Sequence, residues 1–212
     1  VMSERIRAVA PKLRQMDAIH VPDLVGYTDI MVPQLNYFEE WLDGFMDAQA
    51  KGLADAWFYI AWVPQGVYPN RMIDSSYIKP RVLHWYNYLY DTKGYLHWAL
   101  NQWSVPFLTF SPGDNWIVWP SKTRVFDSSL RYEAQKSSLE DCQLLFQLEA
   151  GQRQTAEQLG VQDFDAKALP KAIAHTIIQD LPTYARHWSQ VPAAHRLLLE
   201  NLGLAQEGPP IL

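Results

Sequence analysis

Polar amides and aromatic rings recur near the ends of the apolar segments of this 212-residue chain. A sugar has flat apolar faces ringed by hydroxyl groups, so a sugar site needs aromatic platforms beside Asn, Gln or Tyr. Because a packed core does not require amides at successive strand ends, the combination predicts a pocket. The candidate substrate-binding residues are Gln34, Asn36, Tyr59, Trp62, Asn70, Trp98, Asn101 and Trp103.

Paired carboxyl groups, which glycoside hydrolysis usually requires, are missing from these strand ends. The adjacent acidic pairs Glu39-Glu40 and Glu140-Asp141 fall in helical patterns, where solvated or interhelical roles are expected. Asp74 lies in a long loop and is expected to cap the next helix or to brace the loop. We therefore expect no catalytic residue within the chain itself.

Other chemistries find little support. The six histidines show neither an HExxH motif nor paired metal-ligand spacing, so they predict lone surface or packed side chains and no metal site. No glycine-rich phosphate loop or nucleophile elbow occurs, and no cofactor is expected.

A strand, loop, helix, strand unit from Ala54 to Trp103 carries most of the candidates. The expected strands are 57–63 and 95–103, and a helix is expected over 78–89. A β-helix-β crossover implies parallel strands. By alternation Trp98 and Asn101 lie on opposite faces of the last strand, and the sequence leaves open which face points inward.

Two further strands are expected earlier, at 18–21 and 29–33, with only a loop or single turn between them. Helices are expected from Met2, ended by Pro11, and from Leu35 to Phe45. Four strands in βα order predict an α/β fold, the C-terminal half of a (β/α)8 TIM-like barrel comprising strands five to eight.

The last part of the chain is predicted to be helical. Residues 104–127 suggest a loop excursion with a small hairpin. A helix capped by Ser128-Ser129 and ended by Gly151 should follow, and then more helices. This pattern predicts two parts, the half-barrel at 1–127 and C-terminal helices at 128–212 that pack on it.

Charge and cysteine content exclude several classes of partner. The net charge is −5 with no Lys/Arg cluster, which argues against nucleic acid and is compatible with a neutral ligand. No apolar run of 18 residues exists, so no membrane span is expected. Cys142 is the single cysteine, which excludes an intrachain disulfide and leaves the compartment undecided.

An ordered set of motifs runs through the chain: WFY-AWVPQGVYPN at 57–70, Ile73-Asp74, Arg81, Trp85, GYLHWALNQW at 94–103 and SLRYEAQKSSLEDCQLL at 129–145. This set resembles the C-terminal half of the domain of unknown function 4091, which is similar to the catalytic barrel of glycoside hydrolase family 123. Lys136, Ser138 and Cys142 depart from that pattern.

The resemblance implies β-N-acetylgalactosaminidase activity by a substrate-assisted mechanism, in which an Asp-Glu pair at the end of the fourth strand acts on the sugar. That pair would lie upstream of Val1. The resemblance also implies that Tyr59 and Trp98 point inward.

Two functions remain open. One is part of a glycoside hydrolase barrel that supplies the sugar platform. The other is a non-catalytic carbohydrate-binding or scaffold protein on the same fold. In both cases a carbohydrate is the expected ligand, and the open sheet edges should bind the missing N-terminal half of the barrel or a second copy of the chain.

Overall fold

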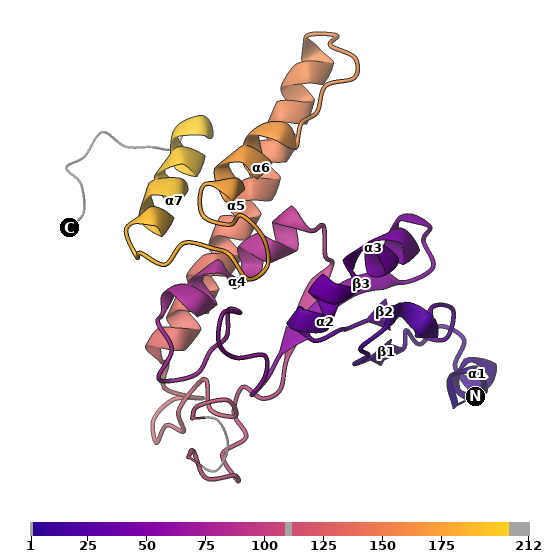
Figure 1. Cartoon of the computed structure of the whole chain (residues 1–212), viewed down its shortest axis with the longest axis vertical. Helices are drawn as coiled ribbons and strands as arrows, with labels where there is room; N and C mark the ends of the chain where they lie inside the picture. Colours follow the sequence, from indigo (N-terminus) through magenta and orange to yellow (C-terminus); the bar gives the residue numbers. More distant parts are fainter. Residues whose placement is uncertain (1, 109–111, 204–212) are drawn as a thin grey trace.

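The computed structural model of the chain describes residues 2–108 and 112–203. Four short strands and a set of helices form a mixed α/β arrangement (Figure 1). The strands are β1 (Met16–Asp17), β2 (Ile30–Met31), β3 (Asp55–Ile60) and β4 (Gly94–His97). The helices are α1 (Met2–Val9), the 3-10 turn η1 (Pro22–Leu24), α2 (Leu35–Glu40), α3 (Leu42–Ala50), α4 (Ile78–Leu89), α5 (Leu130–Gln158), α6 (Ala168–His175) and α7 (Gln190–Asn201).

The four strands form one parallel sheet in the order β1-β2-β3-β4, as expected for part of a TIM-like barrel. The first strand lies slightly earlier than predicted, at 16–17. Its ladder nevertheless continues, because Val32 N donates to Asp17 O at 3.0 Å and Ile19 N donates to Val32 O at 3.2 Å. A single 3-10 turn follows it, as predicted.

The prediction that the fourth strand continues to Trp103 is wrong, because β4 ends at His97. Beyond that point the chain pairs with the excursion and not with β3. Ile117 N donates to Leu100 O at 2.9 Å, and Gln102 N donates to Asn115 O at 3.0 Å. The excursion contains the small antiparallel bridges expected of it, while residues 109–111 within it lie outside the described residues.

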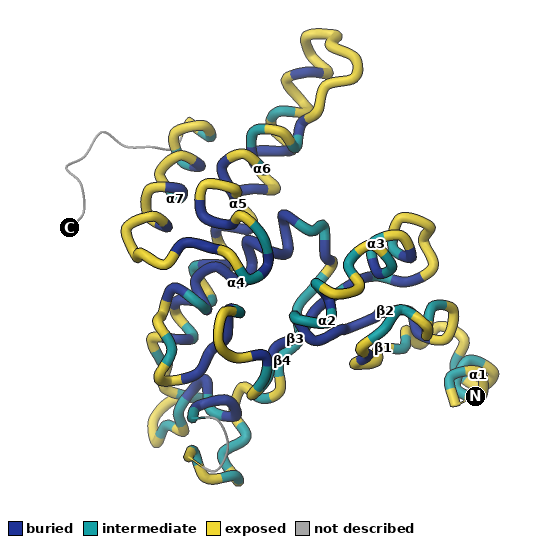
Figure 2. Tube along the Cα trace, in the orientation of Figure 1, coloured by how far each residue is buried: buried dark blue, intermediate teal, exposed yellow. Residues whose placement is uncertain are grey.

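Burial distinguishes the two faces of the sheet. In β3 the residues Ala56, Phe58 and Ile60 are buried and alternate with partly exposed ones (Figure 2). The β3–β4 register places Tyr95 beside Phe58, with ring centroids 5.5 Å apart on the helix-covered face. Tyr59 and its partner Leu96 therefore lie on the face that the helices leave open.

Helix α4 forms the centre of the helical layer. Apart from the half-buried Lys79, every residue of the helix is buried. Its polar side chains are buried because α4 packs against α5 on one side and contacts Tyr95 of β4 through His84 on the other (Figure 1).

Helix α5 begins as predicted, since Ser129 caps it by accepting a hydrogen bond from Tyr132 N at 3.2 Å. The prediction that Gly151 ends this helix is wrong, because α5 runs on to Gln158. One glycine costs a helix only about 1 kcal/mol relative to alanine, which does not outweigh seven further helical residues. The far end of α5 projects from the rest of the molecule (Figure 1).

A buried carboxylate joins three helices. Asp141 of α5 accepts hydrogen bonds from Arg81 and from Trp85 Nε1 (2.9 Å), both on α4, and from His195 Nδ1 (2.7 Å) of α7. The interhelical role expected for one acidic pair is thus confirmed for Asp141, whereas the neighbouring Glu140 is exposed.

Helix α1 ends at Val9, before Pro11, as predicted, but its apolar stripe is not buried. Met2, Val9 and Leu13 are among the most exposed large apolar side chains of the described residues. Within residues 2–108 and 112–203, no helix is both long and apolar enough to cross a membrane.

Candidate functional site

Three of the predicted residues form one hydrogen-bonded group where the strands end. Tyr59 OH donates to Gln34 Oε1 at 3.3 Å, and Gln34 Nε2 donates to Asn36 Oδ1 at 2.5 Å. Burial raises the pKa of Tyr59, with Tyr37 nearby as a smaller cause, so its hydroxyl remains protonated and able to donate at neutral pH. The group is electrically neutral. Gln34 is buried with both ends of its amide hydrogen-bonded, whereas Asn36 and Tyr59 are partly exposed.

Backbone pairing explains why this group forms. Gln34 and Tyr59 are bridge partners across β2 and β3, and Tyr59 is in register with Leu96 of β4. Partners in a parallel ladder project from the same face, so these side chains make one row across the open face. The carboxyl ends of parallel strands are where α/β proteins place ligands.

Two exposed tryptophans lie just after the ends of β3 and β4. Trp62 follows β3 and Trp98 follows β4, and both are more than half exposed. Rings of this size are normally buried, so their exposure at neighbouring strand ends makes them platforms on which a sugar face could stack.

Asn70 was predicted to bind substrate, but its side chain points into its own loop. It is almost completely buried, and its amide nitrogen donates to Ala61 O (2.8 Å) and Pro64 O (2.7 Å). Its side-chain oxygen accepts from Arg71 N at 2.6 Å. Because these bonds occupy both ends of the amide, the geometry makes Asn70 a brace of the loop at 61–71.

Asn101 and Trp103 pair with the excursion and not with the sheet. Asn101 forms an isolated antiparallel bridge with Trp116, and Trp103 Nε1 donates to Val118 O at 2.9 Å. The structure therefore separates them from the row of Gln34 and Tyr59, which are paired across the sheet.

The excursion is held in place by arginines that the sequence patterns did not single out. Arg131 Nη1 donates to Arg71 O (2.8 Å) and Gly113 O (2.6 Å), and burial together with Arg71 lowers the pKa of Arg131 to about 10. Gly113 has a φ of +84°, which L side chains rarely adopt, and a Cβ there would also meet Arg131 Nη1 at 2.5 Å, so this position favours glycine. Burial raises the pKa of Asp114 to about 6, although the nearby positive charge of Arg71 acts in the opposite direction and lowers it.

The acidic residues do not form a catalytic pair. Glu39 accepts a hydrogen bond from Tyr68, and Asp141 is held by the interhelical contacts described above. Asp74 lines a cavity of about 320 Å³ with Asn70. It does not cap α4, whose N-cap residue Tyr77 makes no side-chain bond to the helix. Among the described residues, no three His, Cys, Asp or Glu side chains group as metal ligands.

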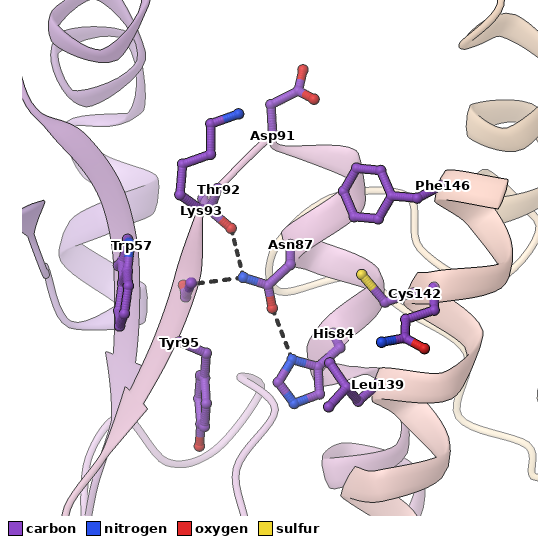
Figure 3. Close-up of a pocket in the computed structure, with 12 residues that line it drawn as sticks. Trp57, His84, Asn87, Asp91, Thr92, Lys93, Tyr95, Leu139, Cys142 and Phe146 are labelled. Atoms are coloured by element: carbon purple, nitrogen blue, oxygen red, sulfur yellow. Dashed lines mark hydrogen bonds between the residues drawn. The ribbon is translucent and has the colours of Figure 1, made fainter. Parts of the chain in front are cut away.

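A cavity of about 550 Å³ lies elsewhere, between β4 and α5 (Figure 3). Asn87 occupies its centre, donating to Thr92 Oγ1 (2.8 Å) and Gly94 O (3.1 Å) while its oxygen lies 2.9 Å from His84 Nδ1. None of the eight predicted residues lines it. This groove follows the edge of β4 that no described strand pairs with.

A four-stranded parallel sheet covered by helices, with polar and aromatic groups at the carboxyl ends of its strands, is the architecture of part of a TIM-like barrel. Comparison with known families then identifies it. The model of the glycoside hydrolase 123 catalytic domain matches residues 1–148, so the chain belongs to this family.

Solved structures agree on the fold. The chain resembles a family 123 glycoside hydrolase from Clostridium perfringens, studied for glycolipid glycan hydrolysis, with a TM-score of 0.65 and 15% identity. The match covers 95% of this chain and 38% of that one, so the chain spans well under half the length of the solved relative. No curated protein matches the chain.

Proposed function

We propose that this chain supplies part of the sugar-binding face of a glycosidase. Its substrate would be a glycan with a terminal β-linked N-acetylhexosamine of the N-acetylgalactosamine type. The observation that carries the proposal is the neutral group of Gln34, Asn36 and Tyr59 at the strand ends of a family 123 domain. Amides and a protonated phenol suit hydroxyl and acetamido groups, which are uncharged donors and acceptors.

The eight predicted residues take different roles in this proposal. Gln34, Asn36 and Tyr59 hydrogen-bond the sugar, and Trp62 and Trp98 stack on it. The other three position the loops around the site. Asn70 does so by binding carbonyl oxygens of its own loop, and Asn101 and Trp103 do so by their contacts with the excursion.

The proposed mechanism is substrate-assisted and retaining. The oxygen of the 2-acetamido group attacks the anomeric carbon while a carboxylic acid gives its proton to the departing oxygen. A second carboxylate orients the acetamido group by accepting its N–H. Water then opens the cyclic intermediate, giving its proton back to the first carboxylate. Since no described acid lies in a pair at a strand end, the proposal places both carboxyl groups before Val1, on the strand next to β1.

We further propose that more strands of the same domain pair with the free edges of β1 and β4, with a second copy of this chain as the alternative occupant. Two observations support this. The solved relative is much longer than this chain, and the groove of Figure 3 exposes apolar side chains such as Leu139 and Phe146 beside the β4 edge. Parallel barrels leave no open edge once complete.

Turnover of matched substrates tests the function. The protein with its complete catalytic domain should cleave an aryl β-N-acetylgalactosaminide and fail on the matched galactoside, because removing the acetamido group removes the nucleophile. Residues 1–212 alone should cleave neither. Equal turnover of both sugars would refute the mechanism, and sugar binding without any turnover would favour the non-catalytic carbohydrate-binding alternative.

A further inference from the structure

We infer that His20 is a hydrogen-bonding residue of the sugar site, held in place by Tyr37. The inference rests on the proposed function, since it adds one contact to the same site. His20 comes after the two-residue strand β1, and its type and spacing alone had suggested only a lone surface or packed histidine.

Strand register places His20 in the row of site residues. β1 pairs with β2 as Met16 with Ile30 and Asp17 with Met31, and the ladder continues through the bonds of Val32 to Asp17 and Ile19. Continuing this register along both segments places His20 opposite Gln34, and Gln34 is the bridge partner of Tyr59. Ile19 is buried in the core and His20, the next residue, is exposed.

Tyr37 fixes the orientation of the imidazole. The two rings are stacked, with centroids 4.2 Å apart and planes inclined by 21°. Tyr37 lies on α2, one residue after Asn36, so α2 carries both the stacking partner of His20 and a member of the hydrogen-bonded group. A ring held in this way loses less conformational entropy on binding than a free side chain.

The ring nitrogens of His20 make no hydrogen bond or ion pair among the described residues, although the ring itself is ordered by stacking. A neutral imidazole carries one donor and one acceptor, which matches a hydroxyl or acetamido group. The row then presents His20, Gln34 and Tyr59 from three consecutive strands, and a sugar lying across it could contact all three.

Three variants of the protein with its complete catalytic domain test this inference. His20→Ala removes both the stack and the nitrogens, and His20→Phe keeps a ring on Tyr37 without them. His187→Ala is the matched control, because His187 is also exposed but lies in the segment before α7. The probe is the thiazoline derived from N-acetylgalactosamine, titrated by calorimetry, with thermal unfolding measured in parallel.

One lost hydrogen bond weakens binding by about threefold to tenfold, and this loss is expected for both His20 variants while His187→Ala binds like wild type. Wild-type affinity in His20→Phe would overturn the inference, because it would show that only the ring matters. Wild-type affinity in His20→Ala would overturn it as well. Failure of the wild-type protein to bind the probe would instead refute the proposed function on which the inference depends.

Discussion

At the scale of single residues, two tryptophans with nearly equal exposure allow a direct test of the stacking role. Trp98 is 53% exposed after β4, and Trp188 is 52% exposed in the segment before α7. Trp98→Ala should weaken sugar binding by about 0.5 to 1.5 kcal/mol beyond the loss of buried area, whereas Trp188→Ala should change nothing. Calorimetry at two salt concentrations checks this. A loss that depends strongly on salt would mean a charged ligand and contradict the neutral site.

Individual residues also show how far the sequence could predict the site. The positions of Gln34 and Tyr59 near the strand ends were predictable because strand ends follow from the hydrophobic pattern, while their contact with a sugar stays a prediction. The role of Asn70 was not, since the carbonyls that it binds come from the path of its own loop. His20 was missed because its strand is too short to show alternation, and only the register with β2 reveals its neighbours.

At the scale of helices, the buried carboxylate of Asp141 is the contact most sensitive to substitution. Its side chain is 1% exposed, and Arg81, Trp85 and His195 all bond to it. Asp141→Ala would leave the Arg81 guanidinium without its partner carboxylate, so we expect a loss of about 3 to 5 kcal/mol in the free energy of unfolding. Urea denaturation measures it.

The adjacent Glu140 provides the control for this experiment. Its side chain is exposed, and Lys136 Nζ lies 4.0 Å from its carboxylate. Glu140→Ala should therefore change the free energy of unfolding by no more than about 0.5 kcal/mol. Equal losses in the two variants would contradict the interhelical role of Asp141.

The type and order of the helices and strands were predicted well, but the residues at which they end were predicted less well. Apolar spacing predicted α4 well, but the single helix expected from Leu35 to Phe45 is wrong, because Trp41 (φ −117°, ψ 25°) divides it into α2 and α3. The α5 start follows from the Ser129 cap. The end of β4 could not be predicted, because Leu100 pairs with Ile117, far along the chain. The end of α5 was mispredicted because one glycine costs a helix too little to stop it at Gly151.

At the scale of the whole molecule, residues 1–212 alone should self-associate. β1 and β4 each have one edge without a described partner strand, and the stripe of α1 and the groove beside β4 expose apolar side chains. Such edges and patches bind other chains. Light scattering should therefore find dimers or larger species. A well-dispersed monomer that unfolds cooperatively would contradict the half-barrel interpretation.

The central claim is that the sugar binds at the strand ends and not in the groove of Figure 3. Gln34 lies in the first of these places and Gln143 lines the second. The decisive measurement is calorimetric titration of the N-acetylgalactosamine thiazoline onto Gln34→Ala and Gln143→Ala variants of the protein with its complete domain. Loss of hydrogen bonds worth about 1 kcal/mol each predicts that Gln34→Ala binds about fivefold or more weakly, while Gln143→Ala binds like wild type. Weakened binding in Gln143→Ala with an unchanged Gln34→Ala would contradict this account.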